Sequence, residues 1–161
     1  MNYWLVKSEP DECGIDDFVA SGDKPIRWDG IRNYQARNFL RAMKPGDQVL
    51  LYHSSCKQIG VAGVLEVVTE PYVDPLQFEP GSDYYDAKAS TDKPKWSAVD
   101  MRLVGKAGQV LPLATLKQLS ALQTCVLLTR PRLSVMPLTE DEWQAIIKPL
   151  GHLQLFSEAK G

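Results

Sequence analysis

The chain has 161 residues and is 44% hydrophobic and 24% charged, with 11 glycines and 11 prolines scattered along it. This composition excludes a disordered chain, and the length is sufficient for one domain that buries its own core without disulfides or metals. The net charge of −2 argues against an unselective grip on nucleic acid, because such binding scales with the number of phosphates neutralised.

The opening residues, Met1 to Lys7, lack the basic start and apolar run of a signal peptide, and no stretch approaches the roughly 18 apolar residues of a membrane span. We therefore expect a cytoplasmic protein with no membrane contact. The three cysteines, Cys13, Cys56 and Cys125, are odd in number and far apart. Their spacing indicates neither a disulfide framework nor a zinc site, so reduced thiols are expected.

The first third of the chain predicts one strand and two helices. Residues 3–7 are rich in aromatic and branched side chains and predict an opening strand, and residues 15–19 predict a short helix. From Asn33 onward, apolar residues recur at helical spacing until Lys44-Pro45-Gly46-Asp47 stops the pattern. Asn33 is a suitable N-cap, so the second helix is predicted to begin just after it.

The middle of the chain predicts a hairpin followed by a long loop. Residues 47–53 and 59–68 are apolar and predict two antiparallel strands joined by a turn of small residues. Residues 70–95 carry four prolines and many acids and predict a surface loop, which is the candidate lid over a site. Residues 98–104 alternate apolar and polar side chains, as in a strand with one wet or ligand-facing side.

The last third predicts a short helix at 113–119, strands at 124–128 and 132–136, and a closing helix at 139–148. Thr139 and Glu142 form a capping box for the closing helix. Hairpin-linked strands without regular βαβ alternation predict an α+β fold, with a mixed, barrel-like sheet of about six strands and peripheral short helices.

Charge is distributed unevenly along the chain. Residues 24–44 hold a single acid, Asp29, among many cations, whereas residues 66–92 hold many acids and a single cation, Lys88. One face of the folded protein is therefore expected to be locally basic, although the whole chain is slightly acidic. The cations of the first segment are Lys24, Arg27, Arg32, Arg37, Arg41 and Lys44.

The densest group of candidate functional residues lies at 27–38, in a connection and the first turn of a helix. Trp28 offers a flat face on which a base can stack, which is worth roughly 1–3 kcal/mol per base. The Asn33 and Gln35 amides can donate to and accept from a base edge, and Arg37 can meet a phosphate. The alternative is structural, since a tryptophan before a helix often packs as a staple and amides often cap helices.

Several blocks of the sequence, taken together and in order, carry a family resemblance. They are Tyr3 to Pro10, Trp28 to Asn38, Tyr52-His53-Ser54, Tyr84-Tyr85-Asp86 and Arg132 to Pro137. On these blocks the chain resembles the EVE domain family over residues 1–150, which leaves 151–161 as a C-terminal tail. The resemblance implies a PUA-like fold, related to the YTH readers of methylated adenine, and a pocket suited to a modified base in DNA or RNA.

The resemblance also implies roles for individual side chains around that pocket. Lys7 and Ser8 would form one wall of the pocket, and Tyr52, His53 and Ser54 the opposing wall. Trp28 would be the stacking face and Trp96 a second aromatic wall, while Asn33, Tyr34 and Gln35 would read the base edge. Arg132 and Ser134 would form a polar or phosphate-contacting end.

These roles have structural alternatives. Tyr52 can belong to the core, Trp96 can anchor its loop, and Arg132 can pair with Asp100 across neighbouring strands. The chain also departs from the common family pattern at Cys13-Gly14, where an aromatic residue followed by serine is more usual. Glycine is a weaker helix cap than serine, so the departure concerns a cap rather than the pocket.

A catalytic interpretation is not favoured. Cys56 or Ser54 beside His53 would be the nucleophile and base, but residues so close on a strand and turn rarely reach one another with an orienting carboxylate behind them. A metal site at His53 and Cys56 lacks two further ligands at matching spacing, and no phosphate-cradling motif is present. We therefore expect neither an enzyme nor a bound cofactor or metal.

Two hypotheses of function follow. One is a non-catalytic module that binds a modified nucleobase in DNA or RNA, and the other is a sensor or processing module for a free nucleobase-like small molecule. The net charge favours the free ligand, whereas the basic excess between Lys24 and Lys44 favours the polymer. Trp28→Ala is expected to abolish base binding with little loss of fold, and Arg37→Ala to weaken polymer binding more than nucleoside binding.

Overall fold

The computed structural model describes residues 1–151 and 153–155. Its elements in chain order are β1 (Tyr3–Ser8), α1 (Ile15–Ser21), β2 (Ile26–Trp28), α2 (Tyr34–Arg41), β3 (Gln48–His53), β4 (Gly60–Val67), β5 (Tyr72–Val73), η1 (Pro75–Phe78), β6 (Ser97–Pro112), α3 (Leu113–Leu116), η2 (Ser120–Leu122), α4 (Val126–Thr129), β7 (Val135–Leu138), α5 (Glu140–Leu150) and β8 (Leu153–Leu155). The two η elements are short 3-10 helices.

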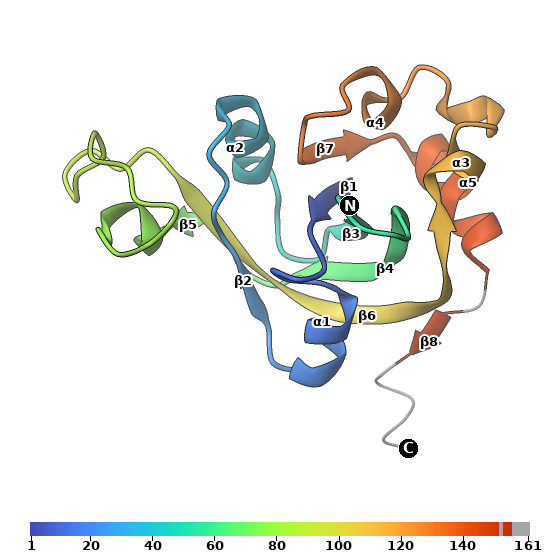
Figure 1. Ribbon diagram of the computed structural model, residues 1–161, viewed down its shortest axis with the longest axis horizontal. Helices are drawn as coiled ribbons and strands as arrows, with labels where there is room; N and C mark the ends of the chain where they lie inside the picture. Colours follow the sequence, from blue (N-terminus) through green and yellow to red (C-terminus); the bar gives the residue numbers. More distant parts are fainter. Residues whose placement is uncertain (152, 156–161) are drawn as a thin grey trace.

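The strands of the described residues form a curved sheet in the order β2-β6-β4-β3-β1-β7, and β5 and β8 also pair with β6. β1 and β3 run parallel, whereas the other pairs are antiparallel. Figure 1 shows β6 sweeping beneath β1, β3, β4 and β7, with α2 above it and α3 and α5 at one end. The predicted α+β class, with a barrel-like mixed sheet and peripheral short helices, is confirmed.

The central strands β3 and β4 are buried along almost their whole length. They are apolar runs rather than alternating patterns, as expected where both faces of a sheet are covered. The predicted antiparallel pairing of these two strands is confirmed. β1 lies beside β3 in parallel, so Ser8 and His53 end their strands at the same edge of the sheet. Polar side chains from two distant parts of the chain therefore meet at that edge.

Local side chains set the helix ends. The Asn33 side chain accepts a hydrogen bond from a first-turn backbone N–H at 2.9 Å, so it caps α2 as predicted. At α5, Thr139 and Glu142 form the predicted reciprocal box, with distances of 2.8 and 3.1 Å. Gly14 has no side chain to cap α1, but the Asp17 carboxylate accepts its N–H at 2.7 Å. The N-terminal end of α1 is therefore capped by a carboxylate of the first helical turn rather than by the side chain of the capping residue.

Several segments differ from the expectation; among them, the strand expected at 132–136 is β7 at Val135–Leu138, and the loop expected at 70–95 contains β5 and η1. Residues 26–28, expected in a connection, form β2, and residues 124–128, expected as a strand, overlap the helix α4. β6 runs for 16 residues instead of ending at Val104, because it pairs in turn with β2, β4, β5 and β8. Short local patterns do not decide such cases, since strand formation depends on partners that are distant in sequence.

Part of the expected C-terminal tail belongs to the sheet. β8 pairs antiparallel with β6, with Leu155 opposite Gly105 and Leu153 opposite Ala107. Residues 152 and 156–161 of that tail lie outside the described residues. The sheet thus extends beyond residue 150, where the domain was expected to end.

Candidate functional site

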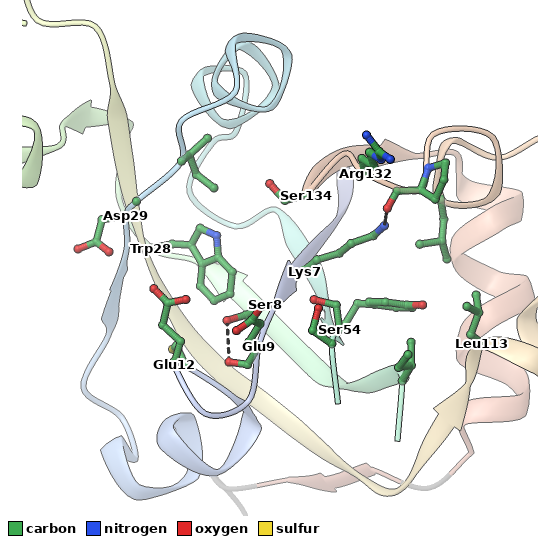
Figure 2. A pocket seen from close by; sticks show the side chains of 18 of the residues that line it. Lys7, Ser8, Glu9, Glu12, Trp28, Asp29, Ser54, Leu113, Arg132 and Ser134 are labelled. Atoms are coloured by element: carbon green, nitrogen blue, oxygen red, sulfur yellow. Dashed lines mark hydrogen bonds between the residues drawn. The ribbon is translucent and has the colours of Figure 1, made fainter. Parts of the chain in front are cut away.

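A cavity of about 880 Å³ opens where β1 and β3 end. Figure 2 shows Ser8, Glu9 and Ser54 near its centre, with Trp28, Asp29 and Glu12 on one side, Lys7 and Arg132 on the other, and Ser134 above the centre. Of the side chains implied by the resemblance, those that line this cavity are Lys7, Ser8, Trp28, Tyr52, Ser54, Arg132 and Ser134. Segments far apart in the sequence are therefore brought together at one place.

The strand register explains why these segments lie together at the cavity. Lys7 lies opposite Tyr52 in the parallel β1–β3 pair, and the Ser54 N–H donates to the Ser8 carbonyl oxygen at 3.0 Å just beyond it. On the other side of β1, the Lys7 N–H donates to the Ser134 carbonyl oxygen at 2.9 Å. The segment before β7 is thereby joined to the same edge as the ends of β1 and β3.

Lys7 is a fixed cation at this edge. Its Nζ donates a hydrogen bond to the Pro131 carbonyl oxygen at 2.7 Å and lies 5.4 Å from the centre of the Tyr52 ring. Partial burial lowers the pKa of Lys7 from its usual value. Tyr52 is buried and also lines the cavity, so it belongs to the core and to the wall at once.

Trp28 lies across the cavity from Lys7, at the end of β2 (Figure 2). Its ring stacks on Phe18 with centroids 6.3 Å apart, and only 6% of the residue is exposed. The indole is therefore part of the core as well as a wall of the cavity. The expectation that Trp28→Ala costs little stability is wrong, because truncating a buried tryptophan typically costs about 3–5 kcal/mol.

Tyr84 lines the cavity, although the sequence assigned it no binding role. Its hydroxyl donates to the Glu12 carboxylate, and its ring covers the α-carbon of Gly30. Gly30 has a φ of +76°, which a residue with a side chain adopts only under strain. The Tyr84-Tyr85-Asp86 block was the sequence feature that could have drawn attention to Tyr84. No local pattern, however, predicts that this block packs against residue 30.

A buried carboxylate, Asp74, fastens the loop that carries Tyr84. Asp74 is fully buried, and it accepts hydrogen bonds at 2.8 to 3.0 Å from the N–H groups of Gly30 and Leu76 and from the Arg32 guanidinium. Arg32 also donates to the Tyr84 carbonyl oxygen at 2.9 Å. The loop expected as a lid is thus tied at its base to the segment that follows β2.

Tyr34, Arg37 and Trp96 form a cluster outside the cavity. Tyr34 is 54% exposed and stacks on Trp96 with centroids 4.9 Å apart, and the Arg37 guanidinium lies 4.8 Å from the Tyr34 ring. The buried Trp96 donates its indole N–H to Asp86 at 2.8 Å. Trp96 therefore anchors its loop, which was the structural alternative to a binding role, and it does not line the cavity as a second aromatic wall.

His53 has a structural partner. Its Nε2 accepts the Ile15 N–H at 3.1 Å, at the first residue of α1. Burial lowers the pKa of His53, so the imidazole is neutral at pH 7. The lone pair of Nε2 therefore accepts the bond that holds the start of α1. His53 does not line the cavity, although its neighbour in the strand, Tyr52, does.

Asn33 and Gln35 line a second cavity of about 380 Å³, whose other walls are residues 130–133. Gln35 Oε1 accepts a hydrogen bond from the Arg130 guanidinium, while the Asn33 side chain caps α2. The two predicted edge readers therefore do not share a cavity with Trp28. Pro131 and Arg132 line both cavities, so the second adjoins the first. Arg132 does not pair with Asp100, which accepts the Tyr72 hydroxyl instead.

Charged groups of both signs line the large cavity. Glu12 and Asp29 lie near Trp28, where Arg27 pairs with Asp29 at 2.7 Å, whereas Lys7 and Arg132 lie opposite (Figure 2). Such an arrangement offers acceptors to one part of a ligand and donors to another.

Cys13 also lines the cavity. Burial, with the Asp17 carboxylate next in effect, raises the pKa of the Cys13 thiol to about 11, so the thiol is protonated at neutral pH. Within residues 1–151 and 153–155, no group of three or more His, Cys, Asp and Glu side chains is placed to hold a metal ion. No helix in the same part of the chain is long and apolar enough to cross a membrane.

Comparison with known proteins places these features in a family. Residues 2–149 match the EVE domain. The chain is 43% identical to human thymocyte nuclear protein 1 over 163 residues, which cover 91% of this chain and 72% of that protein. That relative is named as a nuclear protein, which contradicts the expected cytoplasmic location. The opening residues, on which that expectation was based, carry no information that distinguishes the cytoplasm from the nucleus.

Two solved structures match over nearly their whole length. The human THYN1 protein in complex with 5-methylcytosine-containing DNA has a TM-score of 0.90 and 40% identity, covering 94% of this chain and 99% of that one. A protein from Pseudomonas putida has a TM-score of 0.88 and 50% identity, with coverages of 92% and 99%. On sequence and on structure, this chain belongs to the EVE domain family.

Proposed function

We propose that this protein binds DNA carrying a modified base, and that the base enters the cavity between Trp28 and the ends of β1 and β3. The observation that carries the proposal is the cavity itself, which combines an aromatic wall, apolar side chains and charged groups of both signs in about 880 Å³. The match to a relative whose structure contains 5-methylcytosine DNA supports it independently.

Aromatic and apolar walls supply stacking and a place for a substituent. A base lying against Trp28 gains roughly 1–3 kcal/mol from stacking. A methyl group buried against apolar side chains gains about 0.8 kcal/mol more, which is the physical reason to prefer a modified base over its unmodified form. The apolar side chains that line the cavity are Ile26, Ile31, Ile59, Leu113, Leu127 and Leu128.

The carboxylates define which base edges fit. Asp29 pairs with Arg27 at 2.7 Å and Glu12 accepts the Tyr84 hydroxyl, whereas the Glu9 carboxylate has no side-chain partner within the described residues. A carboxylate such as Glu9 accepts from the exocyclic amino group of cytosine. Thymine and uracil present a carbonyl oxygen at that position, which a carboxylate repels. The cavity therefore favours a modified cytosine or adenine, and the cations on the opposite side face the sugar and phosphate.

We place the protein among binding modules without catalysis. The thiol that lines the cavity, Cys13, is held protonated, and the imidazole of His53 is engaged by the Ile15 N–H. The strand neighbours Ser54 and His53 therefore do not form an activated nucleophile, which requires a free base within reach of the hydroxyl.

The test is a titration at low salt, followed by intrinsic tryptophan fluorescence. The probes are one short DNA strand with a single 5-methylcytosine, the same strand with cytosine, and the same strand with thymine. We expect saturable quenching, about fourfold tighter for the methylated strand than for the cytosine strand, as the burial of one methyl group requires. Equal affinities for the three strands would contradict the proposal.

A free nucleobase-like small molecule is the second candidate. It is favoured by the net charge of −2, since an excess of negative charge repels a polyanion. The matching free nucleosides distinguish the two cases. A nucleoside that binds as tightly as its oligonucleotide, with no dependence on salt, would favour the small-molecule function.

A further inference from the structure

The second cavity is lined by Asn33, Gln35 and residues 130–133. It adjoins the base cavity, because Pro131 and Arg132 form part of both walls. In DNA, a base that leaves the stack keeps its sugar and flanking phosphates attached, so those groups must rest on the surface beside the cavity that takes the base. The second cavity is such a neighbouring surface.

The walls of this cavity carry positive charge and no acid. Its two ionisable side chains are Arg130 and Arg132. The ion pairs of the described residues are Arg27–Asp29, Arg32–Asp74, Arg102–Glu66 and Lys106–Asp16, so neither of these arginines has a carboxylate partner there. Two arginines that face one cavity without a counter-charge repel each other, and an anion between them removes that repulsion.

The local structure holds this arginine pair at a fixed position. Gln35 Oε1 accepts a hydrogen bond from Arg130, and the Lys7 ammonium donates to the Pro131 carbonyl oxygen between the two arginines. Arg132 is exposed and forms no hydrogen bond within the described part of the chain, so all of its donors are free. Figure 2 shows Arg132 beyond Lys7, on the side of the base cavity away from Trp28.

We propose that the second cavity binds the phosphodiester next to the modified base, with Arg130 and Arg132 as its ligands. Guanidinium groups recognise phosphate oxygens through paired charge-assisted hydrogen bonds, which suits a site built from two arginines. The inference rests on the proposed function, since it needs a base in the adjoining cavity. It explains how a chain of net charge −2 holds a polyanion, because the positive charge is concentrated where one phosphate lies.

The variants that test this site are Arg130→Gln and Arg132→Gln, and the matched control is Arg102→Gln. Arg102 is also a surface arginine, but it pairs with Glu66 and lines neither cavity. The probes are the methylated base as a nucleoside, as its 5′-monophosphate, as its 3′-monophosphate, and inside a trinucleotide. The two monophosphates separate a terminal phosphate from an internal phosphodiester and identify the side on which the phosphate lies.

Each cavity variant is expected to bind the trinucleotide about tenfold more weakly and to lower the slope of log affinity against log salt by about 0.7. Nucleoside affinity is expected to stay unchanged, and the Arg102→Gln control to match the wild type with every probe. Wild-type affinity and slope in both cavity variants would overturn the inference. A monophosphate that binds as tightly as the trinucleotide would replace the phosphodiester with a terminal phosphate as the ligand, and would also overturn it.

A second measurement separates failure of this inference from failure of the proposed function. Inorganic phosphate is added to the wild-type protein and to both variants, and the Gln35 side-chain amide signal is followed by NMR. A shift in the wild type that is lost in the variants supports an anion site, whether or not the protein distinguishes methylated from unmethylated strands. No shift in the wild type would remove the anion site while leaving the base cavity untouched.

Discussion

The ring of Tyr84 lies so close to the α-carbon of Gly30 that a Cβ built there would be 2.9 Å from the Tyr84 Cζ atom. The two residues belong to different walls, since Gly30 follows β2 and Tyr84 comes from the loop held by Asp74. Their contact closes one side of the base cavity without any side chain at residue 30. The integrity of the cavity therefore depends on a glycine.

Gly30→Ala is expected to lower the free energy of unfolding by about 3 kcal/mol and to weaken base binding, because it adds a clash with Tyr84 to the strain of a positive φ. Gly22→Ala is the matched control, since Gly22 has a φ of +62° but nothing within 4 Å of the added Cβ. The control is expected to lose about 2 kcal/mol, the cost of a side chain at φ 62° and ψ −122°, and no affinity. Urea unfolding and oligonucleotide titration measure both effects, and equal losses in the two variants would show that Tyr84 is not involved.

Trp28→Phe tests the stacking wall with less damage than truncation to alanine. Phenylalanine keeps much of the packing on Phe18 but offers a smaller face, so affinity for the modified strand is expected to fall about fivefold. Trp143→Phe is the control, because Trp143 is also buried and stacked, on Tyr3 at 4.7 Å, and lines neither cavity. Binding is measured by anisotropy of a labelled strand. A similar loss of affinity in both variants would point to general loosening of the fold.

Asp74→Asn is expected to destabilise the protein by about 2–4 kcal/mol, because it leaves the Arg32 guanidinium without its carboxylate partner in a largely buried place. Limited proteolysis should then cut within residues 79–95 sooner than in the wild type. Glu66→Gln removes the carboxylate of the more exposed Arg102–Glu66 pair and is expected to cost less than about 1 kcal/mol. Wild-type protease resistance of Asp74→Asn would show that this carboxylate does not fasten the loop.

His53 predicts a pH dependence of stability with a defined sign. Burial lowers its pKa below the ordinary value of 6.5, so the unfolded chain takes up a proton at a higher pH than the folded one. The stabilisation is fully present above pH 6.5 and is lost as the pH falls through the folded-state pKa. Protonation also removes the acceptor for the Ile15 N–H.

The measurement is urea unfolding of the wild type and of His53→Gln from about pH 7.5 to pH 5.5, a window that includes the ordinary histidine pKa. The glutamine carbonyl can accept the Ile15 N–H but does not titrate. The wild type is expected to lose stability relative to the variant toward low pH, by no more than about 1.4 kcal/mol per pH unit. A constant difference across this range would show that His53 is not the titrating group.

Some features were accessible from the sequence because they are local. The Asn33 cap, the Thr139–Glu142 box and the apolar runs of β3 and β4 depend on residues within a turn or a strand of one another. Hydrogen bonding and burial over such short distances follow from residue type and spacing, so these elements were predicted with nearly correct bounds. The blocks that indicated the family were equally visible.

The composition of the site was decided only by the tertiary structure. Whether a side chain lines the cavity depends on strand register and on the curl of the sheet, which bring Ser8 beside Ser54 and set Trp28 across from Lys7. A shift of one residue in register reverses the face on which a side chain lies, and no local pattern records it. For the same reason Tyr84 could not be placed over Gly30, and Trp96, His53 and the amides of α2 were assigned to one pocket although the fold separates them.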